Sequence, residues 1–153
     1  MIHQTKEEQE ILYIDMDNVL VDFPSAFPKV APELLEQYAN DKDEIPGIFE
    51  LMDPMRGAID AYHQLAAVYD TYILSTSPWK NPEAAMHKIE WVHKHLPEVA
   101  HKRLILSHNK HLNRGDYLID DRPNNGAEKF EGEWIHFGQA PFENWEQVLD
   151  HLL

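Results

Sequence analysis

The chain has 153 residues and a mass of 17.9 kDa, which is typical of one domain with a buried core. Its 13 basic and 27 acidic residues give a net charge of −14, which repels nucleic acids and anionic membranes, and the absence of cysteine excludes disulfides and thiol catalysis. The N-terminus, MIHQTKEEQE, is unlike a signal peptide, and no apolar run reaches the roughly 20 residues that span a bilayer. We therefore expect one cytoplasmic domain over residues 1–153, with neither nucleic-acid polymer nor membrane as partner.

Five short apolar runs, rich in β-branched and aromatic residues, recur along the chain. They cover residues 11–14, 71–74, 103–106, 117–119 and 134–137. Continuous runs of this kind are typical of strands buried on both faces of a parallel sheet. Helical patterns separate most of them, so the sequence predicts an α/β fold with a mostly parallel five-stranded sheet, covered by helices on both faces.

Three helices are predicted from apolar residues at three- and four-residue spacing, at Arg56–Tyr69, Pro82–Leu96 and Phe142–Leu152. In the second, Asn81 is the expected N-cap and Pro82 the first helical residue. The apolar face expected for that helix consists of Ala85, Met86, Ile89, Val92 and Leu96.

Residues 23–55 break this alternation. Their periodicity is weak, with one helical pattern around Glu33–Ala39, and they contain the prolines Pro24, Pro28, Pro32, Pro46 and Pro54. About 30 residues cannot easily bury a core of their own, so a second domain is not expected. We interpret the segment as a small helical cap inserted after the first strand.

Four carboxylates follow two of the predicted strands. Asp15 and Asp17 come after the first strand at a spacing of two, which points both toward one side, and Asp120 and Asp121 follow the strand at 117–119. Ligands of open α/β sheets bind at the carboxyl ends of the strands, where these acids would meet. Their mutual repulsion calls for a cation, and oxygen-rich clusters of this kind suit Mg²⁺.

The other strand ends carry groups that suit an anion. Ser75, Thr76 and Ser77 offer hydroxyls and N–H groups, and Lys110 offers a positive charge in an acidic chain. Carboxylates, hydroxyls and a lysine around a metal match phosphoryl transfer, which needs mainly positioning and charge neutralisation.

The same residues resemble the four ordered motifs of haloacid dehalogenase (HAD) type phosphatases. These motifs are DMDNV (Asp15–Val19), LSTS (Leu74–Ser77), Lys110 and IDD (Ile119–Asp121). The resemblance extends to the 5'(3')-deoxyribonucleotidase family, because DMDNVLVDF is similar to its DMDGVLADF and PGIFELMDPMRGAIDA (Pro46–Ala61) to its PGFFLDLEPIPGALDA. It covers most of residues 11–137 and implies a Rossmann-like HAD core.

The resemblance also implies roles in catalysis. Asp15 would attack phosphorus and form an aspartyl-phosphate, while Asp17 would protonate the leaving oxygen and then deprotonate the hydrolytic water. Mg²⁺ would be bound by the Asp15 carboxylate, the Asp17 backbone carbonyl and Asp121, with Asp120 ranked behind Asp121 as a direct ligand.

On the substrate side, the resemblance implies a nucleoside monophosphate whose phosphoryl oxygens are held by Thr76, Ser77 and Lys110. Phe23 and Phe49 occupy the positions where the family contacts the nucleobase, and stacking on such rings contributes ~1–3 kcal/mol per base. The sequence does not specify the base, the sugar, the position of the phosphate (5' or 3') or the oligomeric state.

The sequence departs from the family pattern at three points. Asn18 replaces a glycine, Trp79 replaces an aliphatic residue after the STSP motif, and the cap is shorter than in animal members. Asn18 bears on loop geometry more than on chemistry, whereas Trp79 and the shorter cap bear on the base pocket.

Two other functions fit part of the pattern. One is hydrolysis of another small phosphomonoester, such as a sugar phosphate. The second, from a different class, is a receiver-like signalling domain that accepts phosphate on Asp15, although receivers place their paired acids before the phosphoacceptor strand. The ten histidines include no HExxH motif and no pair four residues apart, and His108 and His111 are the only notable close pair. We therefore expect solvated residues rather than a zinc site at His87, His93, His95, His101, His108 and His111.

Overall fold

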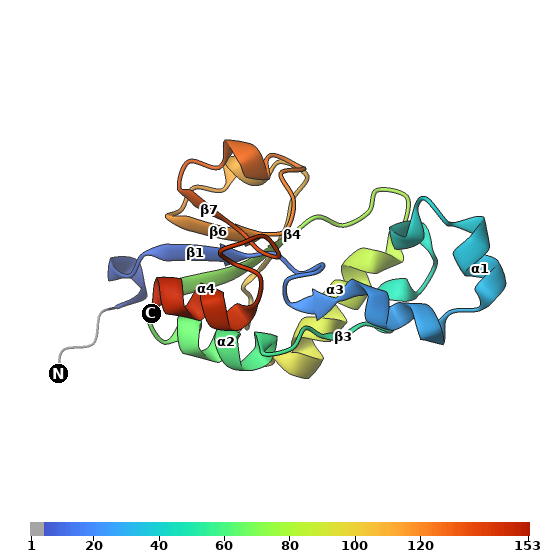
Figure 1. The fold of residues 1–153 in the computed structure, drawn as a ribbon. Coiled ribbons are helices and arrows are strands. Elements are labelled where there is room, and N and C mark those ends of the chain that lie inside the picture. Colours follow the sequence, from blue (N-terminus) through green and yellow to red (C-terminus); the bar gives the residue numbers. More distant parts are fainter. Residues whose placement is uncertain (1–4) are drawn as a thin grey trace.

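The computed structural model describes residues 5–153 and is built on one five-stranded sheet (Figure 1). All its strands are parallel, as predicted, and they lie in the order β5-β4-β1-β6-β7. Each strand begins and ends within one residue of its predicted position. The strands are β1 (Ile11–Ile14), β4 (Asp70–Ser75), β5 (Leu104–Leu106), β6 (Tyr117–Asp120) and β7 (Glu133–His136).

Strand β1 is the centre of the sheet because both β4 and β6 pair with it. Its residues Leu12 and Ile14 are fully buried. From β1 the chain builds the sheet outward through β4 and β5, then returns to β6 on the other side of β1. The carboxyl end of β1 is therefore the point at which the strand order reverses, where ligands of open α/β sheets bind.

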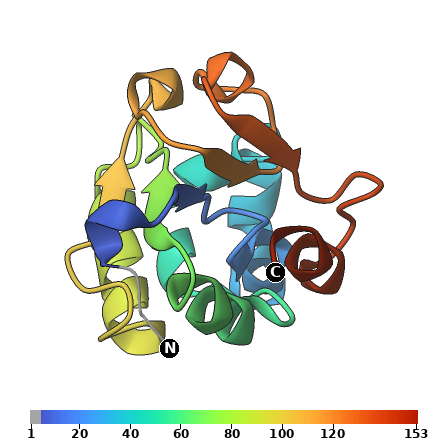
Figure 2. The same ribbon diagram turned by 90° about the vertical axis from the view of Figure 1, so that its left-hand side faces the viewer.

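Three α-helices cover one face of the sheet (Figure 2). They are α2 (Ala58–Ala66), α3 (Glu83–His95) and α4 (Trp145–Leu152). Right-handed crossovers place α2 and α3 on this face, whereas the connections to β6 and β7 run in the opposite direction and lie on the other. On that other face Tyr13 and Leu118 pack against Phe130 and the short 3-10 helix at Ala127–Lys129, so it is covered without the predicted α-helix.

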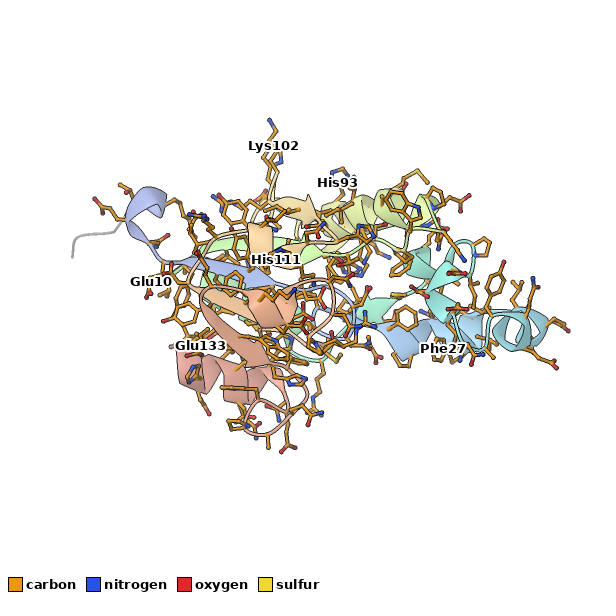
Figure 3. All side chains as sticks on the ribbon, turned by 90° about the horizontal axis from the view of Figure 1, so that it is seen from above. Glu10, Phe27, His93, Lys102, His111 and Glu133 are labelled. Carbon is orange, nitrogen blue, oxygen red and sulfur yellow. The ribbon has the colours of Figure 1, made fainter. Side chains whose placement is uncertain are left out.

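Residues 23–55 project from the carboxyl edge of the sheet, beside α3 (Figure 1). Figure 3 shows Phe27 of this segment at one end of the molecule, with Glu10 and Glu133, at the amino ends of β1 and β7, toward the other. Two short antiparallel strands, β2 (Val21–Asp22) and β3 (Asp53–Pro54), bring the start and the end of the segment together.

The inserted segment contains the predicted helix as α1 (Pro32–Gln37) and the 3-10 helix η4 (Ile48–Glu50). Asn81 was expected to cap α3, but α3 begins at Glu83 and the Asn81 amide donates instead to the carbonyls of Asp43, at 3.0 Å, and Ile45, at 3.2 Å. The prediction was wrong because the amide satisfies buried carbonyls of the inserted segment.

Helix α4 is connected to the loop after β1. The Trp145 indole N–H donates to the carbonyl of Val19 at 2.9 Å, and Asn144 caps the helix by accepting from the N–H of Gln147 at 2.9 Å. Trp145 is buried, so this bond is shielded from water. Within residues 5–153, no helix combines the length and apolar character that crossing a membrane requires.

Candidate active site

Three carboxylates meet at the carboxyl ends of β1 and β6. Asp15 follows β1, Asp120 ends β6 and Asp121 comes next. One carboxylate oxygen of each lies within 4.8 Å of the others. The Asp15 N–H donates to the carbonyl of Ile119 at 2.9 Å, so the pairing of β1 with β6 is what brings these acids together.

The ammonium group of Lys110 lies between two of these carboxylates. Its Nζ is 3.0 Å from Asp15 Oδ1 and 2.6 Å from Asp120 Oδ2, and its side chain is buried. Burial disfavours the ammonium charge, but the two carboxylates outweigh burial and raise the Lys110 pKa. Burial raises the pKa of Asp15, and the Lys110 charge opposes that shift. Lys110 therefore supports the ionised form of Asp15.

Asp121 is the carboxylate best able to accept a cation. Asp120 already accepts from Lys110 and from the Arg122 N–H at 3.1 Å, whereas Asp121 Oδ1 is buried and has no hydrogen-bond partner among the described residues. Burial and the neighbouring Asp15 raise the Asp121 pKa to about 8. An unpartnered oxygen within a cluster of carboxylates fits a divalent cation, which would satisfy that oxygen and offset the repulsion.

Asp17 is held by a lysine that the motif analysis did not single out. Lys88 Nζ lies 3.1 and 3.2 Å from the two carboxylate oxygens of Asp17, and it donates to Ser75 Oγ at 2.8 Å. Lys88 is 1% exposed. Burial raises the pKa of Asp17, and the Lys88 charge acts against this shift. The carboxyl group is thus fixed in direction while burial favours its protonated form.

The position of Lys88 explains an error in the prediction for α3. The expected apolar face was right at Val92 and Leu96, which are buried, but wrong at Met86 and Ile89, which are half exposed. The buried face is formed instead by Ala84, His87, Lys88, Trp91 and Val92. His87 is also contrary to the expectation of solvated histidines. The available signal was that Ala84, Lys88, Trp91 and Val92 share helical spacing, which puts a lysine within an apolar stripe.

Two connected hollows lie at this edge of the sheet. A small recess is lined by Asp15, Asp17, Lys110 and Asp120, and a cavity of about 400 Å³ adjoins it. Both share Asp17 and Thr76 in their walls. The larger cavity is also lined by Phe23, Lys42, Ser77, Trp79, His108 and Arg122. The structure therefore places a charged recess beside a wider space with aromatic walls.

Thr76 and Ser77 both lie where the sequence places them, in the cavity wall after β4. The Thr76 hydroxyl donates to the carbonyl of Ser107 at 2.7 Å, so it would have to rotate before donating to another acceptor.

The two candidate aromatic contacts lie in different surroundings. Phe23 lines the cavity, whereas Phe49 is 3% exposed, does not line it, and lies beneath Lys88 with the ammonium 4.5 Å from its ring centroid. The rings of Phe23 and Phe49 are in contact, with centroids 5.8 Å apart. Trp79 also lines the cavity, with 85% of its surface exposed. The structure thus brings Phe23 and Trp79, but not Phe49, to the cavity.

Asn18 has a backbone φ of 61°, in the left-handed region. Glycine adopts this conformation at least cost, and asparagine is among the few other residues that do so readily. The departure from the family's glycine is therefore accommodated by the backbone of the loop.

Comparison with known proteins identifies the family. A family model described as "5' nucleotidase, deoxy (Pyrimidine), cytosolic type C protein" matches residues 33–148. A protein of Vibrio phage KVP40, provisionally named a 5'(3')-deoxyribonucleotidase, is 52% identical over 96% of this chain and 86% of its own length. The chain belongs to the 5'(3')-deoxyribonucleotidase family. Membership of this family makes it an enzyme, a hydrolase of the phosphatase class.

Other relatives in the 5'(3')-deoxyribonucleotidase family are more distant. The 5'(3')-deoxyribonucleotidase of Bacillus subtilis is 26% identical over 95% of this chain and 99% of its own length. The human cytosolic type is 29% identical over 80% of this chain and 76% of its own length.

Solved structures agree with the fold expected for the 5'(3')-deoxyribonucleotidase family. The HAD-hydrolase YfnB from Bacillus subtilis, solved with bound magnesium, has a TM-score of 0.66 at 12% identity, covering 94% of this chain and 98% of its own. A HAD-superfamily hydrolase from Geobacter sulfurreducens has a TM-score of 0.62 at 11% identity, covering 95% of this chain and 100% of its own. The predicted Rossmann-like HAD core is confirmed.

Proposed function

We propose that the chain hydrolyses nucleoside monophosphates, with deoxyribonucleotides preferred, through a phosphorylated Asp15. The observation that carries the proposal is the charged recess at Asp15, Asp17 and Lys110, joined to a cavity of about 400 Å³ walled by Phe23 and Trp79. The recess has the charges that a phosphate needs, and the cavity is within the size range of small-ligand sites. The names of the phage, Bacillus subtilis and human relatives support this substrate class.

In the first step, an Asp15 carboxylate oxygen attacks phosphorus as the ester P–O bond breaks. The departing oxygen takes the proton of the Asp17 carboxyl group, which burial favours at this position. The nucleoside leaves with that proton, and the phosphoryl group stays on Asp15. Lys110, at 3.0 Å from Asp15, lies where it can neutralise charge on the phosphoryl oxygens.

In the second step, Asp17 acts as a base. It takes a proton from a water molecule, the water oxygen attacks phosphorus, and the Asp15–phosphorus bond breaks to release inorganic phosphate. Asp15 is then a carboxylate and Asp17 is protonated, as at the start. Lys88 keeps the Asp17 carboxyl group in one orientation through both steps.

A divalent cation, which we take to be Mg²⁺, would be held by Asp15, Asp121 and the Asp17 backbone carbonyl, with Asp120 next to it. When bound, it would supply positive charge that draws the phosphate in and stabilises charge that develops on its oxygens. We further propose that residues 23–55 form a cap within a single domain, 1–153, and that Thr76 and Ser77 contact the phosphate. The cytosolic type of the human relative supports action in the cytoplasm.

The test is phosphate release from 5'- and 3'-nucleoside monophosphates, in ribo and deoxy forms, and from sugar phosphates, with Mg²⁺ or EDTA. We expect metal-dependent release that favours deoxyribonucleotides, and acid-quenched enzyme that carries labelled phosphate on Asp15. Preference for a sugar phosphate would contradict the proposed substrate. Stable phosphorylation of Asp15 by a small phosphodonor, without turnover of any ester, would favour a receiver-like role instead.

A further inference from the structure

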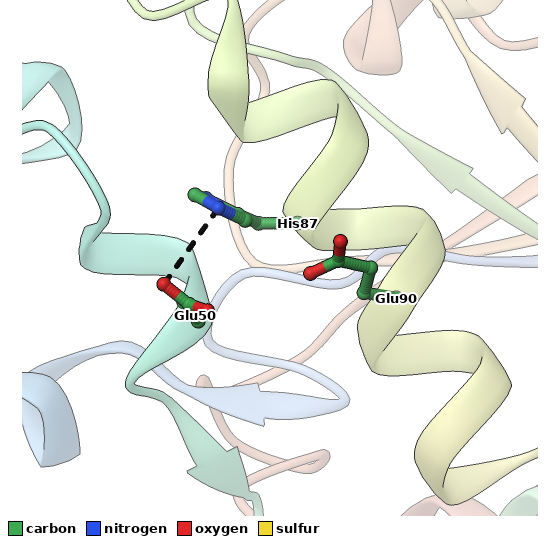
Figure 4. Close-up of side chains that lie close together, drawn as sticks. All are labelled: Glu50, His87 and Glu90. Atoms are coloured by element: carbon green, nitrogen blue, oxygen red, sulfur yellow. Dashed lines mark ion pairs between the residues drawn. The ribbon is translucent and has the colours of Figure 1, made fainter.

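A second cluster of metal-binding side chains lies outside the candidate active site. His87 and Glu90 project from α3, one helical turn apart, toward Glu50 of η4 (Figure 4). One ligand atom of each lies within 4.8 Å of the others, and His87 Nε2 is 3.8 Å from Glu50 Oε2. These residues line a separate cavity of about 250 Å³.

His87 is the observation that points to a ligand. Its side chain is 93% buried, since only 7% is exposed. Within residues 5–153 neither ring nitrogen has a hydrogen-bond partner, and Nδ1 is fully enclosed. Burying an imidazole without hydrogen-bond partners is costly, and its Nε2 lies 3.8 Å from a Glu50 carboxylate oxygen, with the Glu90 carboxylate also close to the ring. A cation bound there would satisfy this nitrogen.

The two carboxylates beside His87 also favour a cation, and they outnumber the one lysine, Lys94, that lines the same cavity. In the described part of the chain, neither Glu50 nor Glu90 has a lysine or arginine nitrogen within 4.0 Å of its carboxylate. Histidine nitrogen and carboxylate oxygen are both zinc ligands, so one imidazole and two carboxylates would supply three ligand atoms of accepted type. Ligand atoms in a tetrahedral zinc site are about 3.3 Å apart, whereas the ligand atoms of these three residues lie within 4.8 Å of one another. Both glutamates are exposed, so their side chains can rotate inward to reach the shorter distance.

We propose that Glu50, His87 and Glu90 bind one divalent transition-metal ion, represented by Zn²⁺. The imidazole nitrogen selects against Mg²⁺, which prefers oxygen ligands, so this site and the carboxylate cluster at Asp15 differ in metal preference. The ion would join the inserted segment to α3. His87 directly precedes Lys88, which holds Asp17, and Glu50 directly follows Phe49, whose ring lies beneath the Lys88 ammonium.

The test is a Co²⁺ titration of the full chain without an affinity tag, in excess Mg²⁺ to occupy the oxygen cluster. We expect one Co²⁺ per chain with the visible absorption of a tetrahedral site, and its displacement by Zn²⁺. Glu90→Gln should weaken Co²⁺ binding at least about tenfold, since even partners outside the metal's direct ligands commonly contribute 10–100-fold. Glu83→Gln is the matched control, because it removes the same charge from an exposed position of α3.

Two further variants keep the result interpretable. Glu50→Gln should weaken binding as Glu90→Gln does, although Glu50 lies on a different element. Asp121→Asn should leave the Co²⁺ signal unchanged, since it alters only the oxygen cluster. Zn²⁺ at about 100 times its Kd should raise the melting temperature by about 5–10 °C in the parent chain but not in Glu90→Gln.

The proposal is overturned if no Zn²⁺-displaceable Co²⁺ signal is found, or if Glu90→Gln and Glu83→Gln bind Co²⁺ equally well. A signal that is lost with Asp121→Asn would also overturn it, because the ion would then lie at the other cluster. The titration needs no substrate, so its failure is separate from a failure of the proposed phosphatase reaction.

Discussion

Lys88 and Asp17 are 71 positions apart in the chain, yet the ammonium of one lies 3.1 and 3.2 Å from both carboxylate oxygens of the other. The same ammonium lies over the Phe49 ring and donates to Ser75. It therefore joins the loop after β1, the end of β4, helix α3 and the inserted segment.

Replacement of this ammonium should change the pH dependence of catalysis. In Lys88→Met, the Asp17 pKa should rise further, because the Lys88 charge that lowers it is gone. An acid with a higher pKa stays protonated to higher pH, so the alkaline limb of kcat/KM should move upward. We expect kcat to fall about 10–100-fold from lost positioning. The pH–rate profile measures both.

The control is Lys94→Met, which removes a charge from an exposed site on α3. Its activity profile should match the parent's, and its stability should stay within about 0.5 kcal/mol. If Lys88→Met lost activity without any movement of the alkaline limb, Lys88 would be a structural residue. Its proposed effect on the pKa of Asp17 during catalysis would then be wrong.

Asp15→Asn should abolish turnover, with a loss of at least about 10³-fold in kcat, because an amide is a poor nucleophile. Circular dichroism should show an intact fold, since the substitution keeps the volume of the side chain. Near-normal phosphate release from this variant would contradict the nucleophile assignment.

The metal-free protein should lose stability as the pH rises. The folded Asp121 carboxyl has a pKa of about 8, against about 3.9 in an unfolded chain, so between these values the folded state binds the extra proton. The free energy of unfolding therefore falls as pH increases through this window. Melting temperatures in EDTA across the window measure the effect, and Mg²⁺ should reverse it.

Asp121→Asn should make that decline shallower, because the amide does not titrate. The remaining slope would come from Asp15 and Asp17, whose pKa values burial also raises. A melting temperature that rises with pH across the same window in EDTA would rule out this account of the cluster.

Phe23 and Phe49 should separate into a substrate contact and a core residue. Phe23→Ala removes a cavity wall, so KM for nucleotides should rise about 5–150-fold, the equivalent of ~1–3 kcal/mol of stacking, with kcat little changed. Phe49→Ala removes a buried ring and should cost about 3–5 kcal/mol of stability. Equal KM values for Phe23→Ala and the parent would place the base elsewhere, with Trp79 next to be tested.

The sequence predicts the sheet and its acids well because both depend on local signals. Apolar runs locate the strands, and an acid directly after a buried strand is placed at the sheet edge by the chain direction alone. The positions of Asp15 and Asp120 follow from that rule. Lys110 was also identified in advance, although only its order among the motifs, rather than its local sequence, distinguished it from a surface lysine.

Contacts that depend on packing between distant elements were not predictable in the same way. Helical spacing places Lys88 in a buried stripe, but no local pattern shows its partners, which are the Asp17 carboxylate, the Ser75 hydroxyl and the Phe49 ring. Asn81 likewise satisfies carbonyls more than 30 positions away. Both residues look like ordinary surface or capping residues until the inserted segment is in place.

The bond from Trp145 to the Val19 carbonyl spans 126 positions, and it fixes the loop that carries Asp17. A ribosome makes that loop early and its tryptophan partner late. On a nascent chain the loop is therefore without this support until α4 has emerged, even though β1, β4 and β6 can already have paired. Catalytic competence should therefore arrive only after α4 has emerged, when most of the sheet can already have formed.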